Sequence, residues 1–448
     1  MATTQTRHAA TAGQTTTRPT GAADSWAARA GRAMPGGVTS FTRVLEPPIT
    51  WVRAEGAHLW DDAGRRYLDY HLAFGPQILG HNHPAVNRAV NEALDRLDCI
   101  GVGSTDLEVR AAEKLIEHVP SAESVLFCNS GSEATMHAVR LARAATGRLK
   151  LIKFQGCYHG AYDSLLLNVI STPDRMAQKD PLSAGLLPQA VDETIVLPFN
   201  DAAAVEETFD RFPEQIAAVI TEPIPHNIGA VLPEPGFLEA LRALTRRHGA
   251  LLIFDEVITG FRHALGGYQA LCGVTPDLTT LAKSMGNGFP VAAVVGRQAL
   301  MRRFMPEGDV FFGGTFNGHP VGLAATLATI ELLEDGAAHR RMFQLGDRLR
   351  RGLGEITRRR GLVATPGGFG SVVVLYFMEP PVRSYADLLR CDGARYVAFH
   401  RGMIERGFFF LPMNLKRVNL SAAHTDEDVD RTLQAADEVL PSLARATW

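Results

Sequence analysis

Two side chains in the middle of the chain have the chemistry of a covalent catalyst. Lys283 stands among apolar and small residues in LTTLAKSMGNGFP, and Asp255 directly follows the apolar run Ala250–Phe254. A lysine in such surroundings loses part of its preference for the charged form and becomes a better nucleophile near neutral pH. A carboxylate at a strand end can hold a ring nitrogen protonated. A Schiff-base amine and such a carboxylate are the groups that pyridoxal phosphate chemistry requires.

A phosphate site is predicted at the turn NSGSEATM, residues 129–136. Ser130, Gly131 and Ser132 place small side chains and backbone N–H groups where a strand passes into a helix. Helix N-termini attract anions because their first N–H groups lack partners within the helix. Plain helix caps have the same pattern, so these residues alone leave both interpretations open.

The elements that must position these residues follow a β–α–β pattern. Short apolar runs without alternation are typical of strands buried on both faces, as in parallel sheets. Such runs occur in SVLFC, KLIKF, IAAVIT and ALLIF, and an acid, Glu222, follows the third. Helical segments lie between them, one of which is closed by Gly249. The sequence predicts an α/β fold with a doubly wound, mostly parallel sheet, in which ligands bind past the carboxyl ends of the strands.

The two ends of the chain differ from its centre. Residues 1–25 are rich in Thr and Ala without hydrophobic periodicity and are predicted to form a disordered tail. Residues 50–70 alternate like a small hairpin sheet, and Thr105 and Glu108 are spaced for a helix capping box. From Pro366 onward the pattern predicts a smaller α+β domain whose final helix starts at Thr425. The predicted divisions are a tail (1–25), an N-terminal segment of the small domain (26–75), a large cofactor-binding domain (76–325) and a C-terminal small domain (326–448).

Composition argues against several classes of protein. The net charge of −3 gives no electrostatic reason to bind nucleic acid or an anionic membrane. No apolar run approaches the roughly 18 residues of a membrane span. The five cysteines are dispersed without a CxxC pair, which favours reduced thiols in the cytoplasm. No pair of histidines has convincing metal-ligand spacing, so we expect no metal site. We expect His159 and the other histidines either to be structural or to support a residue of the site from behind.

Four motifs in the same order resemble those of the class III pyridoxal phosphate aminotransferases, which have fold type I. They are NSGSEATM at 129–136, GCYHG at 156–160, DEVITGFR at 255–262 and LAKSMGNGFP at 281–290. The resemblance runs from about Met34 to the C-terminus and is strongest to the glutamate-1-semialdehyde 2,1-aminomutases. It implies a large domain with a mostly parallel sheet flanked by helices, and a smaller α+β domain built from both ends of the chain.

The resemblance also implies the cofactor, pyridoxal 5'-phosphate, and a role for each matching residue. Lys283 would form the Schiff base, and Asp255 would hold the pyridine nitrogen. Val257 and Tyr158 would pack against the two faces of the ring. The turn at residues 129–136 would bind the cofactor phosphate.

A shared active site is implied by GGTFNGHP at 313–320. In the loop that it resembles, the residue matching Thr315 reaches the phosphate of the neighbouring subunit's cofactor, so we expect a homodimer. Without the resemblance, the segment would be interpreted as a plain Gly-rich turn. One departure concerns the phosphate turn, where Ser132 replaces the threonine that is usual in the aminomutases, although both hydroxyls can donate.

The resemblance points to substrate residues in two places. Ser40 and Arg43, in MPGGVTSFTR, would hold a substrate carboxylate, to which a guanidinium fork is suited. Lys416 stands where the aminomutases have a glutamate, and Arg417 stands where other class III aminotransferases bind an α-carboxylate. Asn227 matches the aminomutases. A solvated Lys-Arg pair is the alternative for 416 and 417, and the substrate pocket is expected to be rebuilt around a retained cofactor site.

Three reactions on this scaffold stay open. The first is an aminotransferase that takes an amino group from a carboxylate-bearing amino substrate through the Lys283 Schiff base. The second is an intramolecular aminomutase, although the missing loop glutamate counts against glutamate semialdehyde as its substrate. The third is an amino-acid epimerase or racemase, which needs only proton return to the opposite face. A nucleotide-binding dehydrogenase would need a GxGxxG turn after an early strand, which the sequence lacks.

Overall fold

A computed structural model describes residues 25–444, which form two compact units. The first unit comprises, of these residues, 25–53 and 59–66. It contains helix α1 (Trp26–Ala33), which Ser25 caps by accepting from the backbone N–H of Ala28, and the short 3-10 turns η2 (Pro35–Gly37) and η3 (Phe41–Arg43). The expected tail lies almost wholly outside the described residues. Three short strands begin in one unit and end in the other: β1 (Trp51–Glu55), β2 (His58–Asp61) and β3 (Arg66–Asp69).

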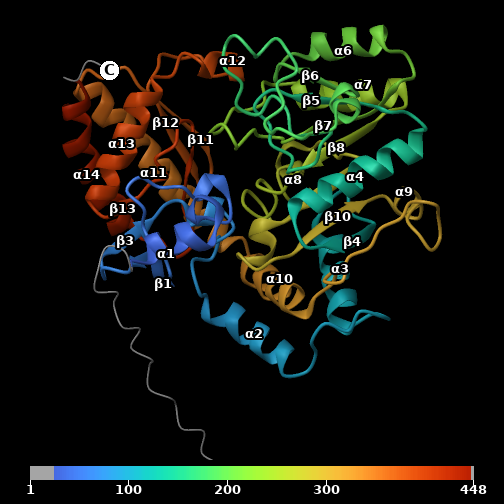
Figure 1. Cartoon of the computed structure of the whole chain (residues 1–448), viewed down its shortest axis with the longest axis horizontal. Coiled ribbons are helices and arrows are strands. Elements are labelled where there is room, and N and C mark those ends of the chain that lie inside the picture. Colours follow the sequence, from blue (N-terminus) through green and yellow to red (C-terminus); the bar gives the residue numbers. More distant parts are fainter. Residues whose placement is uncertain (1–24, 445–448) are drawn as a thin grey trace, which may run out of the picture. The chain divides into compact units, whose positions relative to one another are not determined.

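The second unit is organised around a seven-stranded sheet (Figure 1). The strand order is β4-β10-β9-β8-β7-β5-β6. Only β10 runs antiparallel to its neighbours, β4 and β9, so the sheet is mostly parallel, as predicted. The strand bounds are β4 (Ser124–Cys128), β5 (Lys150–Phe154), β6 (Thr194–Leu197), β7 (Ile216–Thr221), β8 (Leu251–Asp255), β9 (Leu278–Leu281) and β10 (Ala292–Gly296).

Helices bury both faces of this sheet, which is why its central strands are continuously apolar. On β8, Ile253 packs in a cluster with helix α4 (Gly131–Thr146), whereas its neighbours Leu252 and Phe254 pack in a cluster with helix α7 (Phe237–His248). Adjacent residues of a strand point to opposite faces, so both must be apolar when both faces are covered. The remaining helices of this region are α2 (Pro84–Leu94), α3 (Asp106–His118), α5 (Pro188–Asp192), α6 (Ala202–Arg211), α8 (Gln269–Cys272), α9 (Gln298–Met301) and α10 (Pro320–Leu333).

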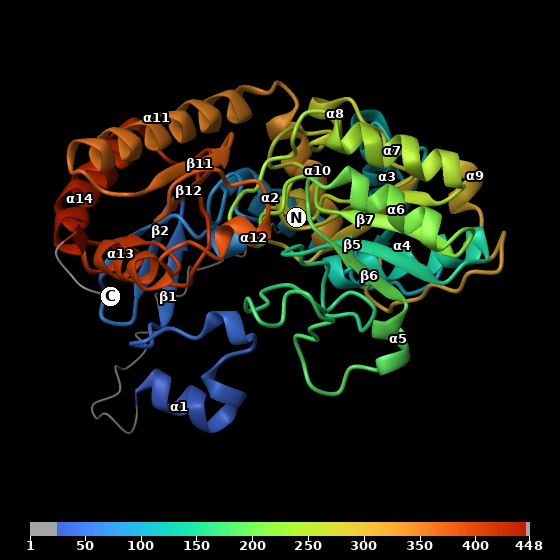
Figure 2. The same ribbon diagram turned by 90° about the horizontal axis from the view of Figure 1, so that it is seen from above.

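The C-terminal part of the second unit has its own small antiparallel sheet of order β11-β12-β14. The long helix α11 lies along this sheet and packs against α14 (Figure 2). The short strand β13 pairs in parallel with β3 through Phe408 and Leu68. The bounds are α11 (Ala337–Arg359), β11 (Thr365–Phe369), β12 (Val372–Tyr376), α12 (Tyr385–Leu388), α13 (Gly393–Glu405), β13 (Phe408–Phe409), β14 (Val418–Asn419) and α14 (Asp426–Ala444).

Several local predictions are confirmed. Thr105 and Glu108 form the reciprocal capping box of α3, and Gly249 closes α7 in the left-handed conformation. The pattern after Pro366 gives the expected strands and helices, with the final helix starting one residue after Thr425. The domain boundaries near residues 75 and 325 stay a prediction. Among the helices of residues 25–444, none combines the length and the apolarity that crossing a membrane would require.

Candidate active site

Five strands end at one edge of the large sheet, and the residues that follow them line a single cavity. Because β4, β5, β7, β8 and β9 run in the same direction, their carboxyl ends meet at this edge. The cavity has a volume of about 310 Å³. Each of the five strands contributes to its lining, through Ser130, Tyr158, Glu222, Asp255 and Lys283 respectively.

Lys283 lies in the short 3-10 turn η5 (Lys283–Gly286) directly after β9. Its backbone has a φ of 50°, a conformation that costs a residue with a side chain free energy and that clusters at functional sites. Burial, and secondarily the charge of Arg417, lower the pKa of its amine to about 8, although Asp255 and Glu222 oppose the shift. About a tenth of the amine is therefore uncharged at pH 7, far more than in an ordinary lysine, and a nucleophile or a base requires this uncharged form.

Asp255 is held rigidly at the end of β8. It is 3% exposed, and its Oδ2 lies 2.7 Å from Nδ1 of His159. Its Oδ1 accepts from the Thr280 hydroxyl at 3.0 Å and from the Val257 backbone N–H at 3.1 Å. A carboxylate with both oxygens engaged has one fixed orientation, which suits it to hold a positive group in the cavity.

The start of α4 forms a cradle for an anion. Ser130 is the N-cap, and its hydroxyl accepts from the Glu133 N–H. Gly131 allows a close approach, because a Cβ at this position would lie 2.9 Å from Cγ1 of Val257. Ser132 accepts from the Ala161 N–H at 3.1 Å. The long helix directs its positive end and its first N–H groups at the cavity, so a phosphate fits there.

Two predicted ring contacts also lie in the cavity. Val257 packs against the start of α4, and Tyr158 is 37% exposed on the loop after β5. Both residues line the cavity with Asp255 and Lys283. The structure thus brings together seven of the eight residues predicted to hold the cofactor, namely Ser130, Gly131, Ser132, Tyr158, Asp255, Val257 and Lys283.

The eighth residue, Thr315, lies on an exposed loop outside this lining. Its backbone oxygen accepts from Sγ of Cys99 at 3.3 Å. Asn317 of the same loop accepts from Asn129 at 2.9 Å, so the loop is anchored beside the phosphate turn of its own chain. Contact with a neighbouring subunit stays a prediction.

The four predicted substrate residues all make hydrogen bonds within the chain, Ser40 and Arg43 to close neighbours in sequence and Lys416 and Arg417 to distant segments. Arg43 donates to the Thr39 hydroxyl at 3.0 Å, and Ser40 lies 3.1 Å from that of Thr42; both belong to the first unit. Their roles stay predictions. The side chain of Lys416 donates to two oxygens of Asn227, the carbonyl at 2.7 Å and Oδ1 at 3.0 Å.

Arg417 is not the solvated surface arginine of the alternative interpretation. It is 6% exposed and donates to the backbone carbonyls of His226 at 2.5 Å and Phe74 at 2.8 Å. Burial lowers the pKa of Arg417 to about 10 and that of Lys416 to about 8. A buried and a half-buried cationic group side by side in one segment favour an anion nearby.

Sequence reasoning gave no specific contact to three residues of the site. His159 was expected to be structural or to support a residue of the site, and it contacts Asp255 directly. Thr280 is a second partner of Asp255, contributed by β9. Glu222 was noted only as an acid after a strand, and burial and the charge of Asp255 raise its pKa to about 7. The positions of Glu222 after a buried strand and of His159 in GCYHG were usable signals, whereas nothing local marked Thr280.

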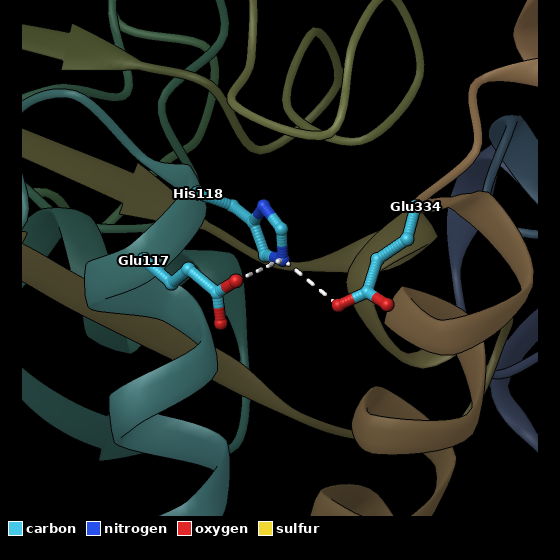
Figure 3. A group of neighbouring side chains, drawn as sticks. All are labelled: Glu117, His118 and Glu334. Carbon is cyan, nitrogen blue, oxygen red and sulfur yellow. Dashed lines mark hydrogen bonds and ion pairs between the residues drawn. The ribbon is translucent and has the colours of Figure 1, made fainter.

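A separate group of three side chains, Glu117, His118 and Glu334, lies where α3 meets the end of α10 (Figure 3). His118 Nε2 is 3.0 Å from Glu334 and 4.0 Å from Glu117. Lys114 already supplies a cation here, since its ammonium lies 2.7 Å from Glu334 and 3.0 Å from Glu117. The group is therefore a surface ion-pair network in which Lys114 is the cation.

The cavity has the parts of a pyridoxal phosphate site, with a lysine of lowered pKa, a fixed carboxylate and an anion cradle facing one space. The profile of the class-III aminotransferases matches residues 41–435. A glutamate-1-semialdehyde 2,1-aminomutase of Desulforudis audaxviator (strain MP104C) is 45% identical over 415 residues, which are 92% of this chain and 95% of that protein.

Solved structures agree with this assignment. An omega-transaminase from Sphaerobacter thermophilus superposes with a TM-score of 0.89 at 35% identity, covering 95% of this chain and 98% of that one. A glutamate-1-semialdehyde-aminomutase from Pseudomonas aeruginosa PAO1, in complex with PMP, superposes with a TM-score of 0.84 at 27% identity, covering 93% of each chain. The chain belongs to the class III aminotransferases, and its cofactor is pyridoxal phosphate.

Proposed function

We propose that the protein moves an amino group within one carboxylate-bearing substrate, as an aminomutase of the glutamate-1-semialdehyde type. The observation that carries this proposal is the 45% identity to a glutamate-1-semialdehyde 2,1-aminomutase along nearly the whole of both chains. Asn227, Ser40 and Arg43, which match the aminomutase pattern, support it. Lys283 and Asp255 line the same cavity, which supports both amino exchange within one substrate and aminotransfer between two substrates.

Each residue of the cavity has its own proposed role in this reaction. Bound pyridoxal phosphate supplies the electron sink for the bond broken at the substrate carbon. The start of α4 would hold its phosphate, Asp255 would keep its ring nitrogen protonated, and Val257 and Tyr158 would hold its ring between them. Lys283 Nζ would attach the cofactor and, once released from it, would move protons between the cofactor and the substrate, onto the carbon that gains the amino group and off the carbon that loses it. Because its pKa is about 8, the same amine can serve as base and as acid near neutral pH.

Aminotransfer between two substrates is the second candidate, and Lys416 and Arg417 favour it. A lysine replaces the glutamate that is expected in the aminomutases, and a buried arginine follows it. A guanidinium at this position suits the α-carboxylate of an amino donor or a 2-oxo acid acceptor. A donor or acceptor with a second carboxylate would also need Arg43.

One experiment separates the candidates. The pyridoxamine form of the enzyme is mixed with glutamate-1-semialdehyde and no other amino donor. Formation of the isomer with the amino group on carbon 1, over many turnovers, supports the aminomutase. If the pyridoxal form of the enzyme, mixed separately with single β- or ω-amino acids, instead converts one of them to its carbonyl product, ends in the pyridoxamine form and needs a 2-oxo acid to continue, aminotransfer is the function. Recovery of the substrate with only its configuration changed would point to an epimerase.

We also propose that the enzyme is a cytoplasmic homodimer in which Thr315 of each chain completes the other's phosphate site. The exposed loop around Thr315 carries two exposed aromatic side chains, Phe311 and Phe316, and Val102 is 82% exposed. Such residues are typical of a surface that a partner covers. Light scattering after size exclusion tests the dimer. Mixed dimers of a Thr315→Ala chain and a Lys283→Ala chain test the sharing. Shared sites would leave one site with both an intact lysine and an intact Thr315, so the mixed dimer should be active there, whereas sites completed within one chain would leave no intact site.

A further inference from the structure

Glu222 joins two loops that meet at the cavity. It is 2% exposed at the end of β7 and lines the cavity beside Asp255. Its Oε1 accepts from the backbone N–H of Tyr158 at 2.9 Å, and its Oε2 accepts from the backbone N–H of His226 at 3.0 Å. One carboxylate therefore connects the loop after β5 to the loop after β7, with one oxygen on each.

The loop after β7 continues this connection to the cationic residues. The N–H of His226 bonds to Glu222, and the carbonyl of His226 accepts from Arg417. The next residue, Asn227, donates to the Gly156 carbonyl at 3.3 Å and accepts from Lys416 at its own two oxygens. The backbone around Tyr158 is thus linked through Glu222 to the segment that holds Arg417.

We propose that Glu222 is a positioning residue that fixes the Tyr158 loop and the Arg417 contact as one unit. The ring face and the cationic side chain must keep a constant separation if a substrate is to lie across both. Because the role lies in positioning, it applies to intramolecular and intermolecular amino exchange alike, and it does not depend on which of them the enzyme performs.

The two hydrogen bonds that Glu222 accepts from Tyr158 and His226, here called the tie, require an ionised carboxylate. A carboxylate can accept at both oxygens, whereas a protonated acid or an amide presents a donor at one of them, which would face a backbone N–H. Burial and the charge of Asp255 raise the pKa of Glu222 to about 7. The other groups that interact electrostatically with it are Lys153, Cys157, Lys283, Lys416 and Arg417. As the pH falls below about 7, protonation removes one of the two bonds of Glu222, and this connection between the loops is broken.

The chain offers a matched control in Glu256. This residue is also a fully buried carboxylate with a raised pKa, and it accepts from the backbone N–H groups of Tyr268 and Gln269. It lies outside the cavity lining. Glu256→Gln therefore removes a buried carboxylate that ties backbone groups, without touching the two loops at the cavity.

Hydrogen exchange on the cofactor-free protein tests the tie directly. Glu222→Gln should raise exchange about tenfold in peptides that cover 156–161 and 223–229, whereas Glu256→Gln should raise it only around 267–272. Glu222→Asp keeps the charge but is one methylene shorter, so it should also raise exchange in at least one of the two cavity loops. Unchanged exchange in both Glu222 variants overturns the proposal.

The loaded enzyme supplies readouts that a merely structural residue would leave unchanged. Both Glu222 variants should alter the visible circular dichroism of the bound cofactor and raise the substrate KM about tenfold with a smaller change in kcat. The acidic limb of activity near pH 7 should persist in Glu222→Asp and Glu256→Gln and disappear in Glu222→Gln. If exchange rises but the circular dichroism, KM and pH profile all stay as in the wild type, Glu222 only stabilises the loops and the proposal fails.

Discussion

His159 Nδ1 and Asp255 Oδ2 lie 2.7 Å apart, although 96 positions separate them in the chain. Nε2 of His159 is buried without a hydrogen-bond partner among residues 25–444. Burial lowers the pKa of His159, so its neutral form carries its proton on Nδ1 and donates it to Asp255. Asp255 is therefore oriented by a neutral donor and keeps its full negative charge available to the cavity.

Removing this donor should weaken catalysis more than folding. His159→Phe keeps the ring volume but loses the hydrogen bond to a charged partner, which is worth about 1.5–3 kcal/mol, so kcat/KM should fall about 10- to 100-fold. Steady-state kinetics and titration of the cofactor-free protein with pyridoxal phosphate measure the loss. His159→Asn, which retains an N–H donor, should recover part of the activity. Wild-type kinetics in His159→Phe would show that Val257 and Thr280 orient Asp255 without help.

Two lysines have similarly lowered pKa values, yet only one should bind the cofactor. Burial brings the pKa of both Lys153 and Lys283 to about 8. The ammonium of Lys153 is saturated by three backbone carbonyls, the nearest that of Leu167 at 2.6 Å, whereas Lys283 lines the cavity. Borohydride reduction of the loaded enzyme followed by peptide mapping should label Lys283 alone. Lys283→Ala should lose the visible absorption band of the lysine-bound cofactor and all turnover, and a reduced adduct surviving in that variant would contradict the assignment.

Local sequence determined the parts of the site that depend on one segment. The runs before Asp255 and around Lys283 indicated a strand end and an apolar setting, and both residues lie at the expected edge of the sheet. The contacts that orient them could not be predicted, because they join separate strands through the sheet order. Thr280 reaches Asp255 because β8 and β9 are neighbours with these two residues in register.

The contacts of Lys416 and Arg417 could not be predicted either, because they too join distant segments. The match of these two residues to substrate-binding positions of related families suggested a substrate role, but a position in the sequence cannot reveal what a side chain contacts. Lys416 and Arg417 bond to the carbonyls of Asn227, His226 and Phe74, which come from distant segments. To bind these two side chains, a substrate carboxylate must displace the backbone carbonyls that now accept from them.

A methyl group at Gly131 should damage the phosphate cradle. An alanine Cβ there would lie 2.9 and 3.0 Å from the two γ-carbons of Val257, so either the helix start or Val257 must move. Overpacking of this kind costs about 1–3 kcal/mol, and we expect Gly131→Ala to weaken pyridoxal phosphate binding at least tenfold. Gly31→Ala in helix α1, where nothing lies within 4 Å of the added atom, is the control and should leave cofactor affinity unchanged. Equal affinity in Gly131→Ala would mean that the cradle is not where the cofactor binds.

Stability should fall as the pH drops from about 6.5 towards 4, because two buried histidines resist protonation. Burial lowers the pKa of His400 and His424 from 6.5 to about 4. Between these values the unfolded chain binds more protons than the folded one, so each histidine reduces the free energy of unfolding by up to roughly 1.4 kcal/mol per pH unit as the pH falls. Well above pH 6.5 neither state is protonated and this contribution is constant.

Urea unfolding of the cofactor-free protein at several pH values between 4.5 and 7.5 measures this dependence. His400→Gln keeps an N–H donor for the Leu411 carbonyl, which now accepts from Nδ1 at 2.6 Å, but it removes the titration. Between pH 4.5 and 6.5, the free energy of unfolding should therefore depend less steeply on pH in the variant, by up to the contribution of one histidine. This holds whatever the stability of the variant at pH 7.5. A slope equal to that of the wild type would mean that His400 is protonated in the folded protein, and its carbonyl partner would then have to compensate for the buried charge.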